Sequence, residues 1–118
     1  MAKGALFVGW GALIPGREAA AQKVLAEAME LLVGLKQAGT IDDFEVVALE
    51  PHGGDLAGFV LVKGDKETIA QLRVSDDFLR MGARVQLVHR HVGIVGAFTG
   101  AEMGALFAMW DQQIEELT

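Results

Sequence analysis

Two histidines that lie two residues apart, His89 and His91, are the strongest candidates for chemistry in this sequence. They belong to the stretch VQLVHRHVGIVG, residues 85–96, whose valines, leucine and isoleucine predict a β-strand. Side chains two apart on a strand point to the same face, so both imidazoles would project together while Arg90 points the other way. Neutral imidazole binds transition metals and titrates near pH ~6.5. The pair is therefore a candidate for proton transfer or for metal binding.

The same pattern has a second interpretation that involves no chemistry. A strand at the edge of a sheet carries polar residues for solubility, or it meets its symmetry mate in a dimer. A metal site needs at least a third ligand, and the only other histidine, His52, has no defined spacing to the pair. Both interpretations of His89 and His91 stay open at this point, and we expect neither a metal nor another cofactor.

Aromatic residues on the predicted strands are candidates for contacting a ligand. Trp10 shares a strand face with Leu6 and Val8, so its indole is predicted to reach the space between the sheet and its helices, or between two sheets. Packing in the core or at an interface is the more common role of a buried tryptophan and is the other interpretation of Trp10. Phe59 lies in a further predicted strand, over residues 56–64. The candidate ligand-contacting residues are therefore Trp10, Phe59, His89 and His91.

The composition excludes several classes of protein. The chain has 118 residues, of which 16 are acidic and 10 basic, and it has no cluster of lysine or arginine that could bind a nucleic-acid backbone. The absence of cysteine excludes disulfides, thiolate zinc ligands and a cysteine nucleophile. The apolar stretch near the N-terminus is broken by glycines and a Pro–Gly pair, so it is too short to span a membrane. We expect a cytoplasmic protein that binds neither nucleic acid nor membrane.

Hydrophobic periodicity predicts the elements that must position these residues. Apolar or alternating runs predict strands over residues 5–11, 40–51, 56–64 and 85–96. Spacings of three and four predict a long helix over residues 14–39, a short helix after Asp65, a further turn after Ser75 and a helix over residues 99–118. Asp65 and Ser75 are predicted caps, Thr99 with Glu102 a predicted capping box, and Gly39 a predicted helix stop. The turn HGGD, residues 52–55, predicts a hairpin between the second and third strands.

The order β-α-β-β-α-β-α predicts one α+β domain over residues 1–118. A ferredoxin-like arrangement with an added C-terminal helix satisfies this order, with an antiparallel four-stranded sheet and the helices on one face. The other face then needs a cover, and the 52% hydrophobic content leaves apolar area to form one. We therefore expect a homodimer in which two sheets pack together.

Four segments spanning almost the whole chain resemble the dimeric α+β barrel superfamily, in particular its short bacterial proteins of unassigned function. These segments are FVGWG, LEPHGGDLAGFVLVKGD, SDDFLRMGARVQLV and VGIVGAFTGAEM. The resemblance implies a ferredoxin-like dimer, with YCII-related proteins and antibiotic-biosynthesis-type monooxygenases as distant relatives. The chain departs from two patterns in that superfamily: it has no asparagine, which the haem-degrading members use, and its long helix lacks the YCII-type histidine.

These observations predict a homodimer that binds a small apolar molecule in a cavity between sheet and helices. The alternative is a cofactor-independent monooxygenase or isomerase that uses His89, His91 and Trp10. A third interpretation is an interaction module with no cavity, whose apolar surface is wholly consumed by the dimer.

Overall fold

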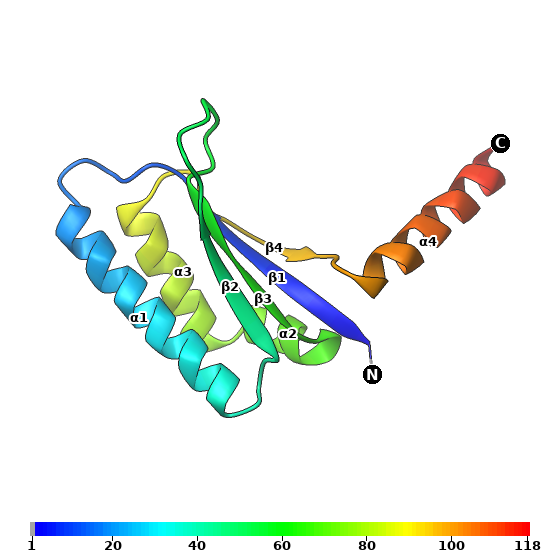
Figure 1. Ribbon diagram of the computed structural model, residues 1–118, viewed down its shortest axis with the longest axis horizontal. Coiled ribbons are helices and arrows are strands. Elements are labelled where there is room, and N and C mark those ends of the chain that lie inside the picture. The colour runs from blue at the N-terminus through cyan, green and yellow to red at the C-terminus, as the bar shows by residue number, and fades with distance from the viewer. Residues whose placement is uncertain (1) are drawn as a thin grey trace.

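The computed structural model describes residues 2–118, which form four strands and four helices (Figure 1). The strands are β1 (Lys3–Trp10), β2 (Asp43–Ala48), β3 (Gly58–Asp65) and β4 (Gly93–Ala97). The helices are α1 (Glu18–Gln37), α2 (Lys66–Arg73), α3 (Asp76–Val88) and α4 (Ala101–Leu117). The strands pair antiparallel in the order β2-β3-β1-β4. This is the predicted ferredoxin-like fold, with β2 and β3 as the predicted hairpin.

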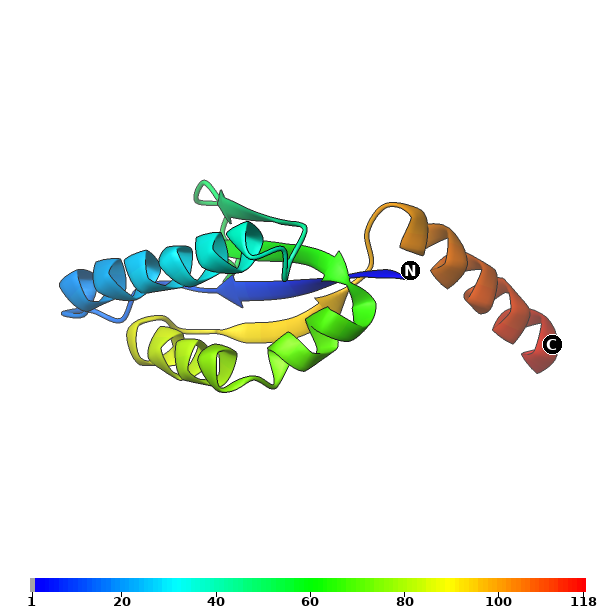
Figure 2. The ribbon, with the colours of Figure 1, turned by 90° about the horizontal axis from the view of Figure 1, so that it is seen from below.

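Helices α1, α2 and α3 cover one face of the sheet, as predicted (Figures 1 and 2). Leu6 and Val8 of the central strand β1 point into this layer and are almost fully buried. Val60 and Val62 of β3 lie beside them in the core. The helices supply the opposite side of the core through Ala21, Val24, Leu32, Ile69, Leu72, Phe78, Met81, Val85 and Val88. One hydrophobic core therefore holds the sheet and three helices together.

The helix boundaries confirm two of the predicted end signals. Gly39 has a positive φ of 76°, and the N–H groups of Gly39 and Thr40 donate to the carbonyls of Lys36 and Leu35 after the end of α1. This is a Schellman motif, which requires the left-handed backbone that glycine adopts without strain. At the start of α3, Ser75 accepts a hydrogen bond from the backbone N–H of Phe78, as a cap should.

Two other predicted caps are wrong. Asp65 stands at the N-cap position of α2, but its side chain makes no cap hydrogen bond and pairs with Lys3 instead. The predicted capping box of Thr99 and Glu102 does not form, because α4 begins after Gly100, whose φ of 57° is positive, and has no side-chain cap. In both places the chain direction at the helix start, rather than the residue type, decides whether the side chain reaches the free N–H groups.

The predicted strand over residues 85–96 is also wrong in its first half. Helix α3 continues through Val85 to Val88, and β4 contains only the residues from Gly93 onward. Valine and leucine favour a strand locally, but the buried residues of α3 recur at a helical spacing and pack on the core. These residues are Phe78, Met81, Gly82, Val85 and Val88. Burial of this stripe outweighs the local preference, and the turn expected after Ser75 becomes a helix of 13 residues.

The second face of the sheet, which we call the open face, is also apolar. Side chains alternate along a strand, so Phe7 points away from the core that contains its neighbours Leu6 and Val8. Its ring lies against Phe59 of β3, with centroids 5.2 Å apart, and Val95 of β4 is 52% exposed. The large apolar residues of the open face are Phe7, Val47, Phe59, Leu61 and Val95. Within residues 2–118 no helix packs across this face (Figure 1).

Helix α4 stands apart from the rest of the chain. It leaves the end of β4 and leads away from the sheet on the side opposite α1 and α3 (Figure 1), and none of its residues is buried. The radius of gyration is 16.2 Å, whereas a compact domain of this length has about 13.5 Å. The extended shape is therefore a consequence of the projecting helix.

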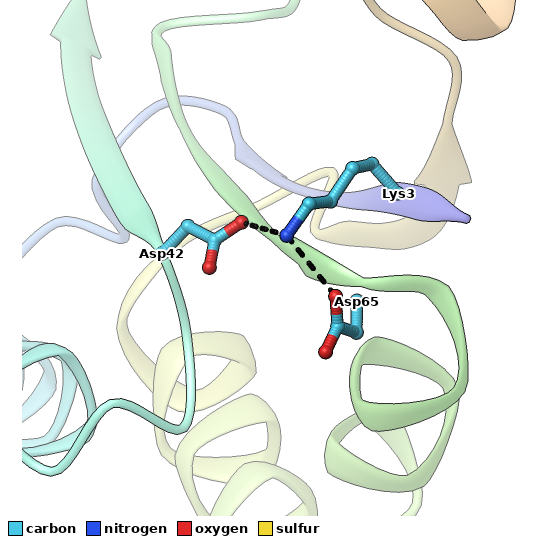
Figure 3. Close-up of polar contacts among 3 residues, drawn as sticks. All are labelled: Lys3, Asp42 and Asp65. Atoms are coloured by element: carbon cyan, nitrogen blue, oxygen red, sulfur yellow. Dashed lines mark hydrogen bonds and ion pairs between the residues drawn. The ribbon is translucent and has the colours of Figure 1, made fainter. Parts of the chain in front are cut away.

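Surface ion pairs connect the ends of the elements. The ammonium of Lys3 donates to carboxylate oxygens of Asp42 and Asp65, at 2.8 and 3.1 Å (Figure 3). These hydrogen bonds raise the pKa of Lys3 above its usual value. Likewise, the hydrogen bond from Lys36 lowers the pKa of Asp43. All five side chains are exposed to water, so these ion pairs contribute little to the stability of the fold.

Candidate functional site

A short ribbon of backbone hydrogen bonds joins the segment after β1 to the segment after α3. The N–H of Gly11 donates to the carbonyl of Arg90 at 2.7 Å, and the N–H of Arg90 donates to Ala12 at 2.9 Å. The N–H of Ile14 donates to Val88, also at 2.9 Å. A Cβ at position 11 would lie 2.7 Å from the Arg90 oxygen, so only glycine permits this approach. The ribbon brings the end of the central strand next to the end of α3.

Trp10 and His89 lie side by side at this junction, with ring centroids 6.1 Å apart. The Nδ1 of His89 lies 3.0 Å from the carbonyl oxygen of Gly11. A carbonyl oxygen can only accept a hydrogen bond, so Nδ1 carries the proton that it donates. In the neutral imidazole this leaves Nε2 as the unprotonated nitrogen. The half-buried His89 therefore has a defined tautomer and a nitrogen available as a base or as a hydrogen-bond acceptor.

The two rings border an apolar cavity between the sheet, α1 and α3. Its volume is about 50 Å³. Strands β1 and β3 contribute Val8, Trp10, Val60 and Val62, and the rest of the lining consists of Ala21, Val24, Leu25, Ala28, Met29, Leu32, Phe78, Met81, Val85 and His89. Apart from His89 and the indole N–H of Trp10, these side chains are all apolar. The site combines an apolar chamber with one titratable group at its border.

The cavity is small for a ligand. A cavity of about 150 Å³ accommodates benzene, so a ligand of that size must displace side chains from the 50 Å³ found here. Met29 and Met81 are suited to such a displacement because their unbranched side chains adapt readily to a changed space. Leu25 is 49% exposed and lies on the outer side of the lining, where a ligand would enter.

Gly58 provides the surface on which the indole of Trp10 lies. The two residues are direct cross-strand partners in β3 and β1. A Cβ at position 58 would lie 2.7 Å from Cζ2 of Trp10 and 2.8 Å from the carbonyl oxygen of Val47. The contact with Cζ2 would push the indole away, and the contact with the Val47 oxygen would meet backbone that cannot easily move. Gly58 therefore determines the position of the ring that borders the cavity.

The structure brings together only two of the four candidate residues. His91 is exposed, has a positive φ of 54° and lies in the bend before β4, so it does not share a face with His89. Phe59 belongs to the open face, on the opposite side of the sheet from Trp10. The expectation that two histidines point together fails because α3 ends between Val88 and His89.

Sequence reasoning did not identify the lining supplied by α1 and α3. Ala21 and Ala28 lie on the core-facing stripe of the predicted long helix, and such a stripe by itself indicates only packing. Small side chains on a buried stripe, opposite strand residues of ordinary size, are the signal that could have indicated a space there.

Residues 2–118 contain neither a cluster of metal-binding side chains nor a membrane-spanning helix. Within this part of the chain no group of three or more His, Asp or Glu side chains has the arrangement of a metal site. None of the helices in the same range has both the length and the hydropathy needed to cross a membrane.

Comparison with known proteins supports the fold. No protein-family model and no curated protein matches the chain. Among solved structures, a DABB family protein with a ferredoxin-like fold from Mesorhizobium loti has a TM-score of 0.63 at 10% identity, covering 84% of this chain and 99% of its own. A dimeric ferredoxin-like protein of unknown function from a Jannaschia species has a TM-score of 0.62 at 14% identity, covering 82% of this chain and 99% of its own.

A third similar structure is SnoaB, a cofactor-independent oxygenase from Streptomyces nogalater. Its TM-score is 0.56 at 11% identity, with 84% of this chain and 92% of the oxygenase covered. At such identities the likeness concerns the fold. The chain has the ferredoxin-like fold, as its sequence predicted.

Substituting Gly58 with alanine tests how Trp10 is positioned. We expect G58A to lower the free energy of unfolding by about 1–3 kcal/mol, because the added methyl group overpacks the indole and the backbone of β2. The fluorescence of Trp10, measured in a Trp110→Phe background, should shift at the same time. The matched control is Gly96→Ala in β4, where a Cβ meets nothing within 4 Å. Equal unfolding curves for both variants would contradict the assigned role of Gly58.

Proposed function

We propose that the protein is a homodimer, formed through its open face, that binds a small apolar molecule in the cavity beside Trp10 and His89. The single observation that carries the binding function is the apolar chamber with one polar group, since ligand sites combine these features. The proposal rests on the geometry of this chain, and the ferredoxin-like neighbours described as dimeric support the assembly.

The open face supports the dimer on physical grounds. Phe7, Phe59 and Leu61 form its centre on the two middle strands of the sheet. A sheet with apolar side chains on both faces is stable in water only when both faces are covered. Two such faces can pack about 10 Å apart, as sheets in a sandwich do. A two-fold arrangement places the same patch on both copies and leaves no unmatched apolar surface.

The charge substitution Val95→Glu tests the dimer. Val95 is 52% exposed in the single chain, so a glutamate is tolerated by the monomer but is desolvated in a sheet-to-sheet interface. We expect V95E to raise the dimer dissociation constant at least tenfold, measured by analytical ultracentrifugation across a dilution series. The control is Val33→Glu on the outer side of α1, where the valine is 41% exposed. A wild-type chain that sediments as a monomer at micromolar concentration would refute the dimer.

The ligand is expected to be uncharged, because the cavity offers no counter-charge. Its apolar part would lie among Val24, Met29 and Met81, and a hydrogen-bonding atom could reach Nε2 of His89 or the indole N–H of Trp10. The two rings have fixed positions, since Gly58 and the Gly11 carbonyl hold them. Specificity would then come from the border of the cavity and affinity from its interior.

Filling the cavity tests ligand binding. Ala28 of α1 lines the cavity, so Ala28→Met is expected to weaken binding of benzene at least tenfold, measured by isothermal titration calorimetry. Ala26, which is exposed on the same helix, provides the matched control Ala26→Met. The thermal unfolding midpoint of each variant reports whether the fold is retained. Unchanged binding by a folded A28M protein would exclude the cavity as the binding site.

A second candidate function is proton abstraction from an apolar substrate by His89, the first step of a cofactor-independent oxygenase or isomerase. The specific observation in its favour is the tautomer that the Gly11 carbonyl imposes, which leaves Nε2 unprotonated in the neutral ring. The oxygenase among the structural neighbours also supports it. In this function His91 has no part, since it lies outside the cavity lining.

Hydrogen–deuterium exchange of an acidic C–H compound tests this second function. With 2-tetralone in D₂O, we expect the wild-type chain and His91→Gln to accelerate exchange, as followed by NMR, while His89→Gln does not. Equal rates for H89Q and wild type would exclude His89 as the base.

A further inference from the structure

Helix α4 has an apolar stripe that is mostly exposed in its own chain, where, within residues 2–118, only Leu106 faces α2 across a hollow. None of its 17 residues is buried. Trp110 is 50% exposed, Ile114 64% and Leu117 87%, and Phe107 contacts Trp110 edge-on at 5.6 Å between centroids. At 100° per residue, one face of the helix carries Met103, Leu106, Phe107, Trp110, Ile114 and Leu117. The acidic residues Asp111, Glu115 and Glu116 lie toward the other side, and Gln112 is opposite Trp110.

A helix of this kind depends on packing. Isolated helices of this length are marginal in water, and most helical stability in proteins comes from an amphipathic face packed on another element. Gly104 in the first turns of α4 weakens the helix further. The stripe therefore indicates a surface that α4 covers and that residues 2–100 of the same chain do not provide.

The position of α4 indicates where this surface is. The helix leads away from the sheet on the side opposite α1 and α3 (Figure 1), which is the side of the open face. A second copy that packs on the open face would stand next to it. Seventeen residues of helix extend about 25 Å, whereas packed sheets are about 10 Å apart. Helix α4 is therefore long enough to pass the sheet of the second copy and reach its helix layer.

The charges of α4 favour a second copy over a membrane. The helix carries Glu102, Asp111, Glu115 and Glu116 and no basic residue, whereas all ten lysines and arginines of the chain lie between Lys3 and Arg90. Helices that bind anionic lipid surfaces use lysine and arginine on their polar face. The absence of basic residues on α4 therefore argues against a lipid surface as the partner of the stripe.

We propose that α4 of each copy packs through its apolar stripe on the body of the second copy, so that two exchanged helices clasp the dimer. This inference rests on the proposed function, since it needs the open-face dimer. The four most exposed large residues of the stripe, Phe107, Trp110, Ile114 and Leu117, each present roughly 100 Å², about half the area that such side chains bury. Two helices thus add about 800 Å² to an interface whose standard size is about 1,600 Å².

Substitutions on the two sides of α4 test the proposal. We expect Trp110→Ala to raise the dimer dissociation constant at least tenfold, as removal of a central interface tryptophan does, while Gln112→Ala leaves it unchanged. Both residues are exposed in the single chain, so neither substitution affects folding of the body. Analytical ultracentrifugation gives both constants. If W110A and Q112A dimerise like the wild type, the clasp is overturned.

Accessibility of Trp110 provides a second measurement. In a Trp10→Phe background Trp110 is the sole tryptophan, and acrylamide should quench it weakly in the dimer and strongly in the V95E monomer. Protection in both states would mean that α4 packs on its own chain, and strong quenching in both would mean that it packs on nothing; either result overturns the clasp while the dimer stands. A wild-type monomer, by contrast, overturns the proposed dimer together with the clasp.

Discussion

The central strands of this protein are apolar on both sides, and the rest of the structure depends on that property. Leu6 and Val8 of β1 point to one face while Phe7 points to the other, and β3 repeats the pattern with Val60 and Phe59. One chain supplies three helices for one face. The open face must then be covered by something else. The proposed dimer follows from this imbalance. Helix α4, which carries an apolar stripe of its own, projects on the same uncovered side.

The candidate site is a small cavity on the covered face. Ala21 and Ala28 of α1 line it, and the indole of Trp10 at its border lies over Gly58 of β3. Close backbone contact at Gly11 then holds His89 beside the indole. The cavity and its one titratable group thus arise from four glycine and alanine positions rather than from a recognisable catalytic motif. Only the geometry therefore identifies the site.

His89 and His91 have different surroundings because α3 ends at Val88, immediately before His89. His89 follows the last buried residue of α3 and remains anchored by a backbone carbonyl. His91, two residues later, has left-handed backbone and faces outward. Of the two histidines, only His89 borders the cavity. The similarity to solved structures supports the fold under both proposed functions, and the choice between binding and catalysis depends on what the Nε2 of this single histidine meets.

The sequence by itself determined the chain order of the four strands and of helices α1, α2 and α4, the hairpin at residues 52–55, the end of α1 at Gly39 and the start of α3 at Ser75. Each of these depends on local periodicity or on turn and cap chemistry, which a short stretch contains in full. Only the tertiary structure decided that residues 85–88 are helical, that Trp10 meets His89, and that Phe59 lies on the other face from both. Those outcomes depend on burial against α1 and on contacts between residues almost eighty positions apart, and such contacts leave no periodic signal in the chain.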